Sequence, residues 1–144
     1  MTAPDTSGQL AEQLLRLTRR LHRAQKRYLD PVGITPAQSR LLRTVAHYDS
    51  PPRMADLARH LEVVPRAVTT LVDALEANGA VRRVPDPSNR RVIRIEITDA
   101  GRTTLSELRA ARRAAVEDVL APLDAGQRDV LGDLLAELLS PDRT

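Results

Sequence analysis

Arginines are the residues best suited to chemistry in this chain, and five of them lie between residues 82 and 94, beside a single acid, Asp86. Their guanidinium groups bind phosphates and guanine edges in a two-pronged geometry. The net charge is only +3, and Lys26 is the only lysine, so a GC-rich genome could also explain the arginine bias. The distribution of the arginines is therefore more informative than their number.

The arginine-rich segment is predicted to form a β-hairpin. Residues 81–84 and 92–97 are β-branched and partly alternating, and Pro, Asp, Ser and Asn separate them. A hairpin tip is thin enough to enter the minor groove of DNA, where arginine benefits from the negative potential of narrow A·T-rich stretches. Arg90 and Arg91 are predicted at this tip, whereas Arg82, Arg83 and Arg94 lie on the strands, where they could meet phosphates. A solvated charged hairpin is the alternative.

A predicted helix at Pro65–Asn78 precedes the hairpin and has short side chains on its outer face. Thr69 and Thr70 can hydrogen-bond a base edge or offer a methyl group to thymine, and Arg66 can bind guanine. An ordinary surface helix would look similar, but helix and hairpin together are more specific. The residues expected to contact DNA are Arg53, Pro65, Arg66, Ala67, Thr69, Thr70, Arg82, Arg83, Ser88, Asn89, Arg90 and Arg91.

The sequence offers little support for catalysis or for a cofactor. It has no glycine-rich phosphate loop, no nucleophile elbow and no HExxH helix. It also lacks cysteine, and His22, His47 and His60 have no ligand-like spacing, so we expect surface or capping histidines and no metal site. A small enzyme would need a convergent catalytic set that is not apparent. We expect a protein that is not an enzyme and has no cofactor.

The composition favours one mainly helical domain. Of the 144 residues, 42% are hydrophobic, mostly Leu, Val and Ala, with no Phe or Trp and only two tyrosines. Without aromatic rings to stack bases, duplex DNA is a better expected partner than single strands or RNA. No apolar run approaches the roughly 18 residues of a membrane span, and the N-terminus lacks signal-peptide features. We therefore expect a cytoplasmic protein with no membrane partner.

The expected fold class is mainly α with a small β-hairpin wing: a winged helix-turn-helix between N- and C-terminal dimerisation helices. The helical patterns cover 9–30, 36–48, 54–60, 65–78, 99–120 and a last helix after Asp124. Thr35 and Gln38 form a predicted capping box. The expected divisions are a flexible tail at 1–8, a dimerisation helix at 9–33, a DNA-binding domain at 34–105 and dimerisation helices at 106–144.

Leucine stripes mark the first and last helices. They would form a large apolar patch if exposed, so a two-fold homodimer of intertwined terminal helices is predicted. A monomeric bundle that folds these helices on its own core is the alternative.

Several strings in the middle of the chain resemble the MarR family of bacterial winged-helix transcriptional regulators. The matching segments are 34–38, 56–58, 68–76, 78–79, 86–91 and 97–101. The resemblance implies a homodimer that binds a palindromic operator, usually as a repressor. Many members of the family release DNA when they bind small aromatic or phenolic ligands. The resemblance also implies that the recognition helix is Pro65–Ala77, that Arg90 enters the minor groove, and that a ligand pocket lies between the first two helices, with His22, Tyr28, His47 and Tyr48 as candidates.

The chain departs from the family pattern near the expected DNA surface. Glu62 stands where glycine commonly makes the helix-turn-helix bend, so an altered or strained turn is expected. Val64 replaces the usual Ser or Thr cap, at a cost of about 1 kcal/mol. Asn89 replaces an aspartate that often steadies the wing arginine, and Thr70 replaces a frequent basic residue. Glu62, Val64 and Asn89 keep open a second hypothesis, a winged-helix protein-interaction module with weak or no specific DNA binding.

Overall fold

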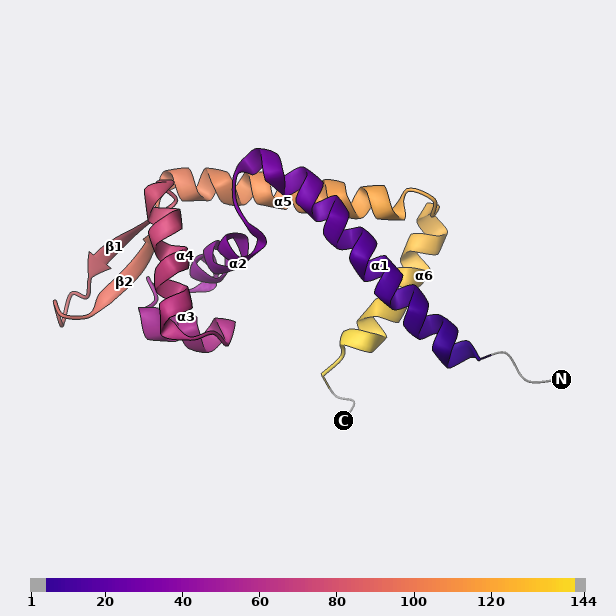
Figure 1. Ribbon diagram of the computed structural model, residues 1–144, viewed down its shortest axis with the longest axis horizontal. Helices are drawn as coiled ribbons and strands as arrows, with labels where there is room; N and C mark the ends of the chain where they lie inside the picture. Colours follow the sequence, from indigo (N-terminus) through magenta and orange to yellow (C-terminus); the bar gives the residue numbers. More distant parts are fainter. Residues whose placement is uncertain (1–4, 142–144) are drawn as a thin grey trace.

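The computed structural model describes residues 5–141, which form an elongated molecule with a winged helical domain at one end (Figure 1). The elements are α1 (Thr6–Leu29), the 3₁₀ turn η1 (Asp30–Val32), α2 (Pro36–His47), α3 (Met54–Leu61), α4 (Pro65–Ala77), β1 (Val81–Pro85), β2 (Ile93–Ile97), α5 (Asp99–Leu120) and α6 (Ala125–Leu139). The predicted fold class, a mainly helical chain with one hairpin, is confirmed.

Helix caps explain most of the boundaries. The Thr35–Gln38 capping box starts α2 as predicted, and Asp124 with Gln127 starts α6 in the same way. The helix α1 begins at Thr6 and not at Gln9, because the Asp5 carboxylate accepts a hydrogen bond from the Gly8 amide at 2.9 Å. Residues 6–8 of the flexible tail predicted at 1–8 therefore belong to α1, while residues 1–4 lie outside the described part of the chain.

One apolar core holds the winged domain together. It combines α2, α3, α4, the hairpin and the first half of α5, and its most deeply buried side chains are Leu41, Leu42, Leu57, Val68, Val72, Leu75, Val81, Ile95 and Leu108. The hairpin pairs antiparallel from Val81 opposite Ile97 to Pro85 opposite Ile93. Gly101 lets α5 start against this sheet, since a Cβ there would lie 2.0 Å from the Ala80 carbonyl oxygen.

The long helix α5 links this domain to the other end of the molecule, where α1 crosses it (Figure 1). Small buried residues, Ala24 on α1 with Ala111 and Ala115 on α5, allow a close crossing. The Tyr28 hydroxyl donates a 2.7 Å hydrogen bond to the Asp118 carboxylate and ties the two helices further. The apolar stripe of α1 therefore packs against α5 only along the C-terminal half of α1.

The remaining apolar surface of the terminal helices is exposed. No residue of α6 is buried, and Leu138 and Leu139 are 73% and 79% exposed. The other exposed members of this terminal apolar surface are Leu10, Leu14, Leu15, Leu17, Val130, Leu134 and Leu135. The monomer thus leaves α6 and the N-terminal part of α1 without an intramolecular cover.

Candidate nucleic-acid interface

The turn between α3 and α4 has the left-handed backbone that the sequence predicted to be strained. Glu62 lies at φ 55° and ψ 44°, and it is the only non-glycine residue with positive φ among residues 5–141. The Val63 amide donates to Ala58 O at 3.1 Å and the Glu62 amide to Arg59 O at 3.3 Å, the two bonds of a Schellman motif. Glu62 therefore occupies the position that favours glycine, and the predicted departure is confirmed.

The outer face of α4 begins at Val64, which is 66% exposed and gives the helix no side-chain cap, as predicted. Arg66, Thr69 and Thr70 are exposed on the first two turns, whereas Ala67 is half-buried at the margin of this face. Within the described residues, no partner is found for the Arg66 guanidinium. The N-terminal half of α4 thus presents one free cation among small side chains, with Pro65 at its first position.

Asp86 organises the wing, which we define as β1, β2 and the turn at 86–92. Its side chain is only 1% exposed. The carboxylate accepts hydrogen bonds from the Ser88 hydroxyl at 2.7 Å, the Ser88 amide at 2.8 Å and the Asn89 amide at 3.3 Å. On its other oxygen it accepts from Arg94 Nε at 2.6 Å. These hydrogen bonds hold the pKa of Asp86 far below its usual range, and the two from Ser88 contribute most.

The arginine that pairs with Asp86 also joins the wing to the segment before α3. Arg94 Nη1 donates to Pro51 O at 2.7 Å, and the Ile95 amide donates to Pro52 O at 2.8 Å. Arg53 lies half-exposed at the same edge, 3.8 Å from the Asp86 carboxylate. Sequence reasoning listed Asp86 only as a charge; the Asp-x-Ser pattern, typical of a side-chain-stabilised turn, was the signal that could have revealed this role.

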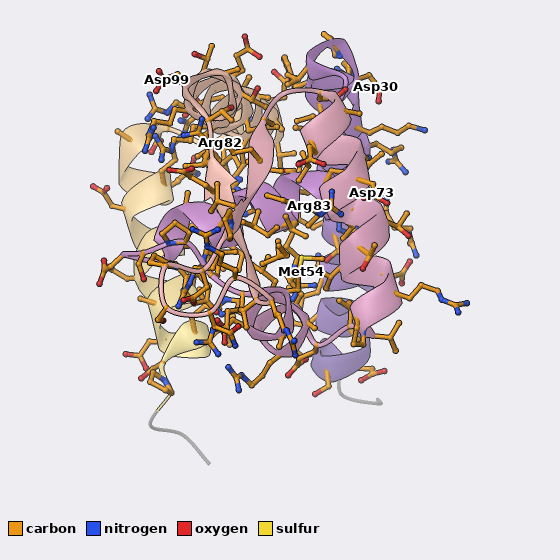
Figure 2. The ribbon with its side chains drawn as sticks, turned by 90° about the vertical axis from the view of Figure 1, so that its left-hand side faces the viewer. Asp30, Met54, Asp73, Arg82, Arg83 and Asp99 are labelled. Carbon is orange, nitrogen blue, oxygen red and sulfur yellow. The ribbon has the colours of Figure 1, made fainter. Side chains whose placement is uncertain are left out.

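The strand arginines are paired with acids of the protein itself, and their contacts with phosphates stay a prediction. Arg82 Nε donates to the Glu96 carboxylate at 2.7 Å, a bond that lowers the pKa of Glu96. Arg83 lies beside α4 (Figure 2) and pairs with Asp73 and, at 2.6 Å, with Glu76. These carboxylates raise the pKa of Arg83, that of Asp73 first. Arg83 therefore fixes the wing against α4 instead of facing outward.

The tip of the wing leaves its own arginines free. Arg90 and Arg91 are exposed, and neither guanidinium has a partner among the described residues. The Asn89 side chain accepts the Arg91 amide at 3.2 Å and the Ser88 hydroxyl is bound to Asp86, so both polar side chains shape the turn. Arg90 and Arg91 therefore lie at the tip of the wing, as predicted.

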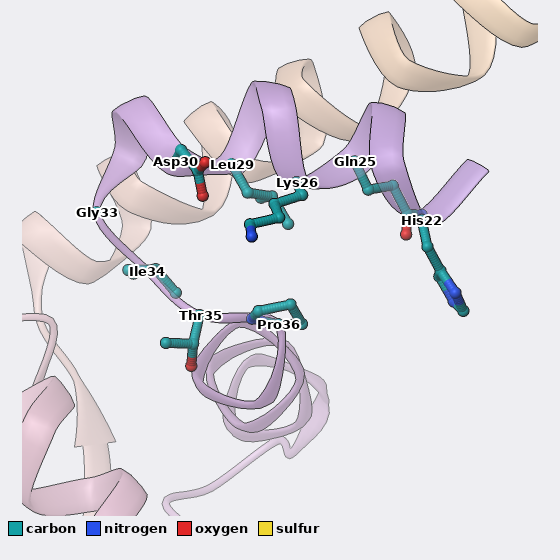
Figure 3. A pocket seen from close by; sticks show the side chains of 9 residues that line it. All are labelled: His22, Gln25, Lys26, Leu29, Asp30, Gly33, Ile34, Thr35 and Pro36. Carbon is teal, nitrogen blue, oxygen red and sulfur yellow. The ribbon is translucent and has the colours of Figure 1, made fainter. Parts of the chain in front are cut away.

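A pocket of about 680 Å³ lies between α1 and the start of α2 (Figure 3). Its lining consists of His22, Gln25, Lys26, Leu29, Asp30, Gly33, Ile34, Thr35 and Pro36. Of the four ligand candidates, only His22 lines it. Tyr28 turns away to Asp118, Tyr48 lines a separate groove with Ile97 and Leu105, and His47 is exposed at the end of α2. Those three side chains therefore do not line this pocket, and their role in ligand binding stays a prediction.

A smaller cavity of about 70 Å³ adjoins this pocket, sharing Gln25, Leu29 and Pro36 with it. It contains an unpaired cationic group: Arg43 Nε is buried without a hydrogen-bond partner. Burial first, then the neighbouring Arg112 and Arg40, lower the pKa of Arg43. An anion placed here would neutralise a desolvated charge.

The described residues hold neither a candidate metal centre nor a membrane span. No three side chains of His, Asp or Glu within 5–141 are grouped to hold a metal ion. No helix in the same range is long and apolar enough to cross a bilayer.

Two helices joined by a tight turn, followed by a cationic hairpin, define a winged helix-turn-helix, the architecture of DNA-binding proteins that place the second helix in the major groove. A model of the MarR family matches residues 34–93. The transcriptional repressor Rv2887 of Mycobacterium tuberculosis is 36% identical over 111 residues, 76% of this chain and 78% of that repressor. The chain belongs to the MarR family.

Other comparisons agree. The match to the transcriptional repressor MdtR of Bacillus subtilis, 32% identical over 93 residues, covers 65% of this chain and only 59% of MdtR. The crystal structure of YusO from Bacillus subtilis superposes with a TM-score of 0.83 at 25% identity, covering 96% of this chain and 97% of that one. The crystal structure of Rv2887 in complex with DNA superposes with a TM-score of 0.76 at 31% identity, covering 96% of this chain and 100% of that one. The crystal structure of Rv2887 in complex with p-aminosalicylic acid superposes with a TM-score of 0.71 at 33% identity, covering 91% of this chain and 98% of that one.

Proposed function

We propose that this protein is a homodimeric transcriptional repressor that binds double-stranded DNA by sequence and acts by binding instead of catalysis. Helix α4 enters the major groove and Arg90 the adjacent minor groove. The observation that carries the proposal is the division among the wing arginines: those on the strands are paired internally, while Arg90 and Arg91 at the tip are free. The DNA complex of the related Rv2887 supports the same partner.

The exposed leucines of α1 and α6 support the dimer. Leu14 and Leu134 are 55% and 58% exposed, and burial of such side chains against a second copy would remove a large apolar area from water. A two-fold dimer presents two copies of α4, so its operator is a palindrome with half-sites about 10 base pairs apart.

The α1–α2 pocket is the proposed site of a small aromatic or phenolic effector that releases the DNA. Its apolar walls, Leu29, Ile34 and Pro36, suit a ring, and the adjoining cavity with Arg43 suits an acidic substituent. The complex of Rv2887 with p-aminosalicylic acid, an aromatic acid, supports this ligand class.

The test compares Arg90→Ala with Arg82→Ala as a matched control from the same hairpin. Fluorescence anisotropy with DNA from upstream of the protein's own gene should show a Kd at least about tenfold higher for Arg90→Ala than for the wild type, since one minor-groove arginine is lost. Arg82→Ala removes an arginine already paired with Glu96 and should change Kd far less. For the wild type, log K should fall with log salt with a slope of about −0.9 per phosphate neutralised.

Equal Kd values for both variants and the wild type would refute the wing contact. DNA binding that is absent or indifferent to sequence, with an intact dimer, would favour the protein-interaction module instead.

A further inference from the structure

The two threonines on the outer face of α4 have their hydroxyl protons engaged. Thr69 Oγ1 donates to Pro65 O at 3.2 Å, and Thr70 Oγ1 donates to Arg66 O at 3.1 Å. Both acceptors belong to the helix itself, in the preceding turn. What the two side chains still offer a partner is a methyl group each, and an oxygen that can only accept.

Val64 adds a third apolar group at the start of the same helix. It is a β-branched side chain that is 66% exposed, at a position where Ser, Thr, Asp or Asn would cap the helix. At that exposure the side chain contributes little burial to the fold, and it satisfies no backbone amide. It therefore stabilises the free protein less than a polar cap would, which is consistent with a role in contacting a partner.

Within α4 the acids near these groups are paired, whereas Glu62, two residues before Val64, is exposed. Asp73, one turn beyond Thr69, is paired with Arg83 of the wing, and so is Glu76. Arg66 is the cation among the first two turns. The N-terminal half of α4 is thus a small, largely methyl-bearing surface with one guanidinium beside it.

We propose that Val64, Thr69 and Thr70 form an apolar surface that reads the C5-methyl groups of thymine in the major groove. This inference rests on the proposed function, since α4 must lie in that groove. The thymine methyl is the one apolar feature of the base edges there. Methyl groups cannot satisfy the polar edge of a G·C pair, whose desolvation would then be uncompensated. The surface therefore selects A·T pairs beneath the start of α4, next to the base or phosphate bound by Arg66.

The experiment begins with selection of a preferred duplex from a random library by the full-length protein. Each thymine of the enriched half-site is then replaced singly by deoxyuridine, which lacks only the C5-methyl. At the positions under α4, each replacement should weaken binding about fourfold, the effect of one methylene-sized contact. Replacement outside the half-site should leave Kd unchanged.

Paired substitutions at Thr69 separate the methyl group from the hydroxyl. Thr69→Ser keeps the hydroxyl and deletes the methyl. At one position of the half-site, this variant should therefore bind the duplex with thymine and the duplex with deoxyuridine with the same Kd. Thr69→Val keeps methyl groups and deletes the hydroxyl, so it should retain the wild-type preference. Val64→Ala should abolish the preference at a different position. Circular dichroism and thermal unfolding verify that each variant is folded.

The outcomes distinguish the inference from the proposed function. If no duplex is enriched, sequence-specific DNA binding fails and the inference with it. If a duplex is enriched but deoxyuridine replacement has no effect, the proposed function stands and the methyl surface is refuted. If Thr69→Val loses the preference while Thr69→Ser keeps it, the hydroxyl reads the base and the inference is overturned.

Discussion

Replacing Glu62 by glycine should stabilise the protein, although glycine usually destabilises a folded chain. The αL conformation of Glu62, φ 55° and ψ 44°, costs an L-residue about 1–2 kcal/mol because its Cβ crowds the following carbonyl oxygen. Glycine removes that cost but gains about 0.4–1 kcal/mol of backbone freedom in the unfolded chain. The difference favours Glu62→Gly by about 0.5–1 kcal/mol, or about 1–4 °C in Tm for a chain of this size.

Glu62→Ala is the matched control, because it removes the same carboxylate and keeps the Cβ. Urea unfolding at a fixed protomer concentration, which matters if the protein is a dimer, gives the free energies of unfolding. Glu62→Gly should be more stable than both Glu62→Ala and the wild type. The DNA affinity should rise equally in the two variants, since each removes one negative charge close to the phosphates.

A free energy of unfolding for Glu62→Gly no higher than that of Glu62→Ala would refute the strain argument. Affinities that differ between the two variants would show instead that the backbone of the turn, and not the charge, limits DNA binding.

Three further predictions concern other parts of the chain. Asp86→Asn should weaken DNA binding by loosening the wing. Because the pKa of Asp86 is lowered in the folded protein, its carboxylate should stabilise the fold fully above about pH 4 and less as the pH falls further. In urea unfolding, the free energy of unfolding should therefore fall less between pH 5 and acid for the variant than for the wild type. Leu134→Glu on α6 should give monomers in light scattering, whereas Asp133→Asn should not. Arg43→Gln should weaken p-aminosalicylate binding about tenfold by calorimetry, if that acid occupies the pocket; unchanged affinity would exclude Arg43 as its anchor.

Most of the secondary structure could be predicted from the sequence because its signals are local. Caps such as Thr35 with Gln38, and the β-branched runs on either side of Asp86, act within a few residues of the backbone they order. The unusual turn at Glu62 was also predictable, since it rests on the conformational preference of one residue. The start of α1 was missed because Asp5 caps a segment whose apolar pattern begins later.

The sequence by itself determined the class of the protein: a helix, a tight turn, a second helix and a cationic hairpin occur in an order that local patterns reveal. Only the tertiary structure decided which arginines remain free. Arg83 reaches α4 and Arg94 reaches Asp86 and Pro51, while Arg90 reaches nothing among the described residues. The reason is physical: a charge is neutralised by whatever lies within a few ångströms, and in a folded chain those neighbours come from distant segments.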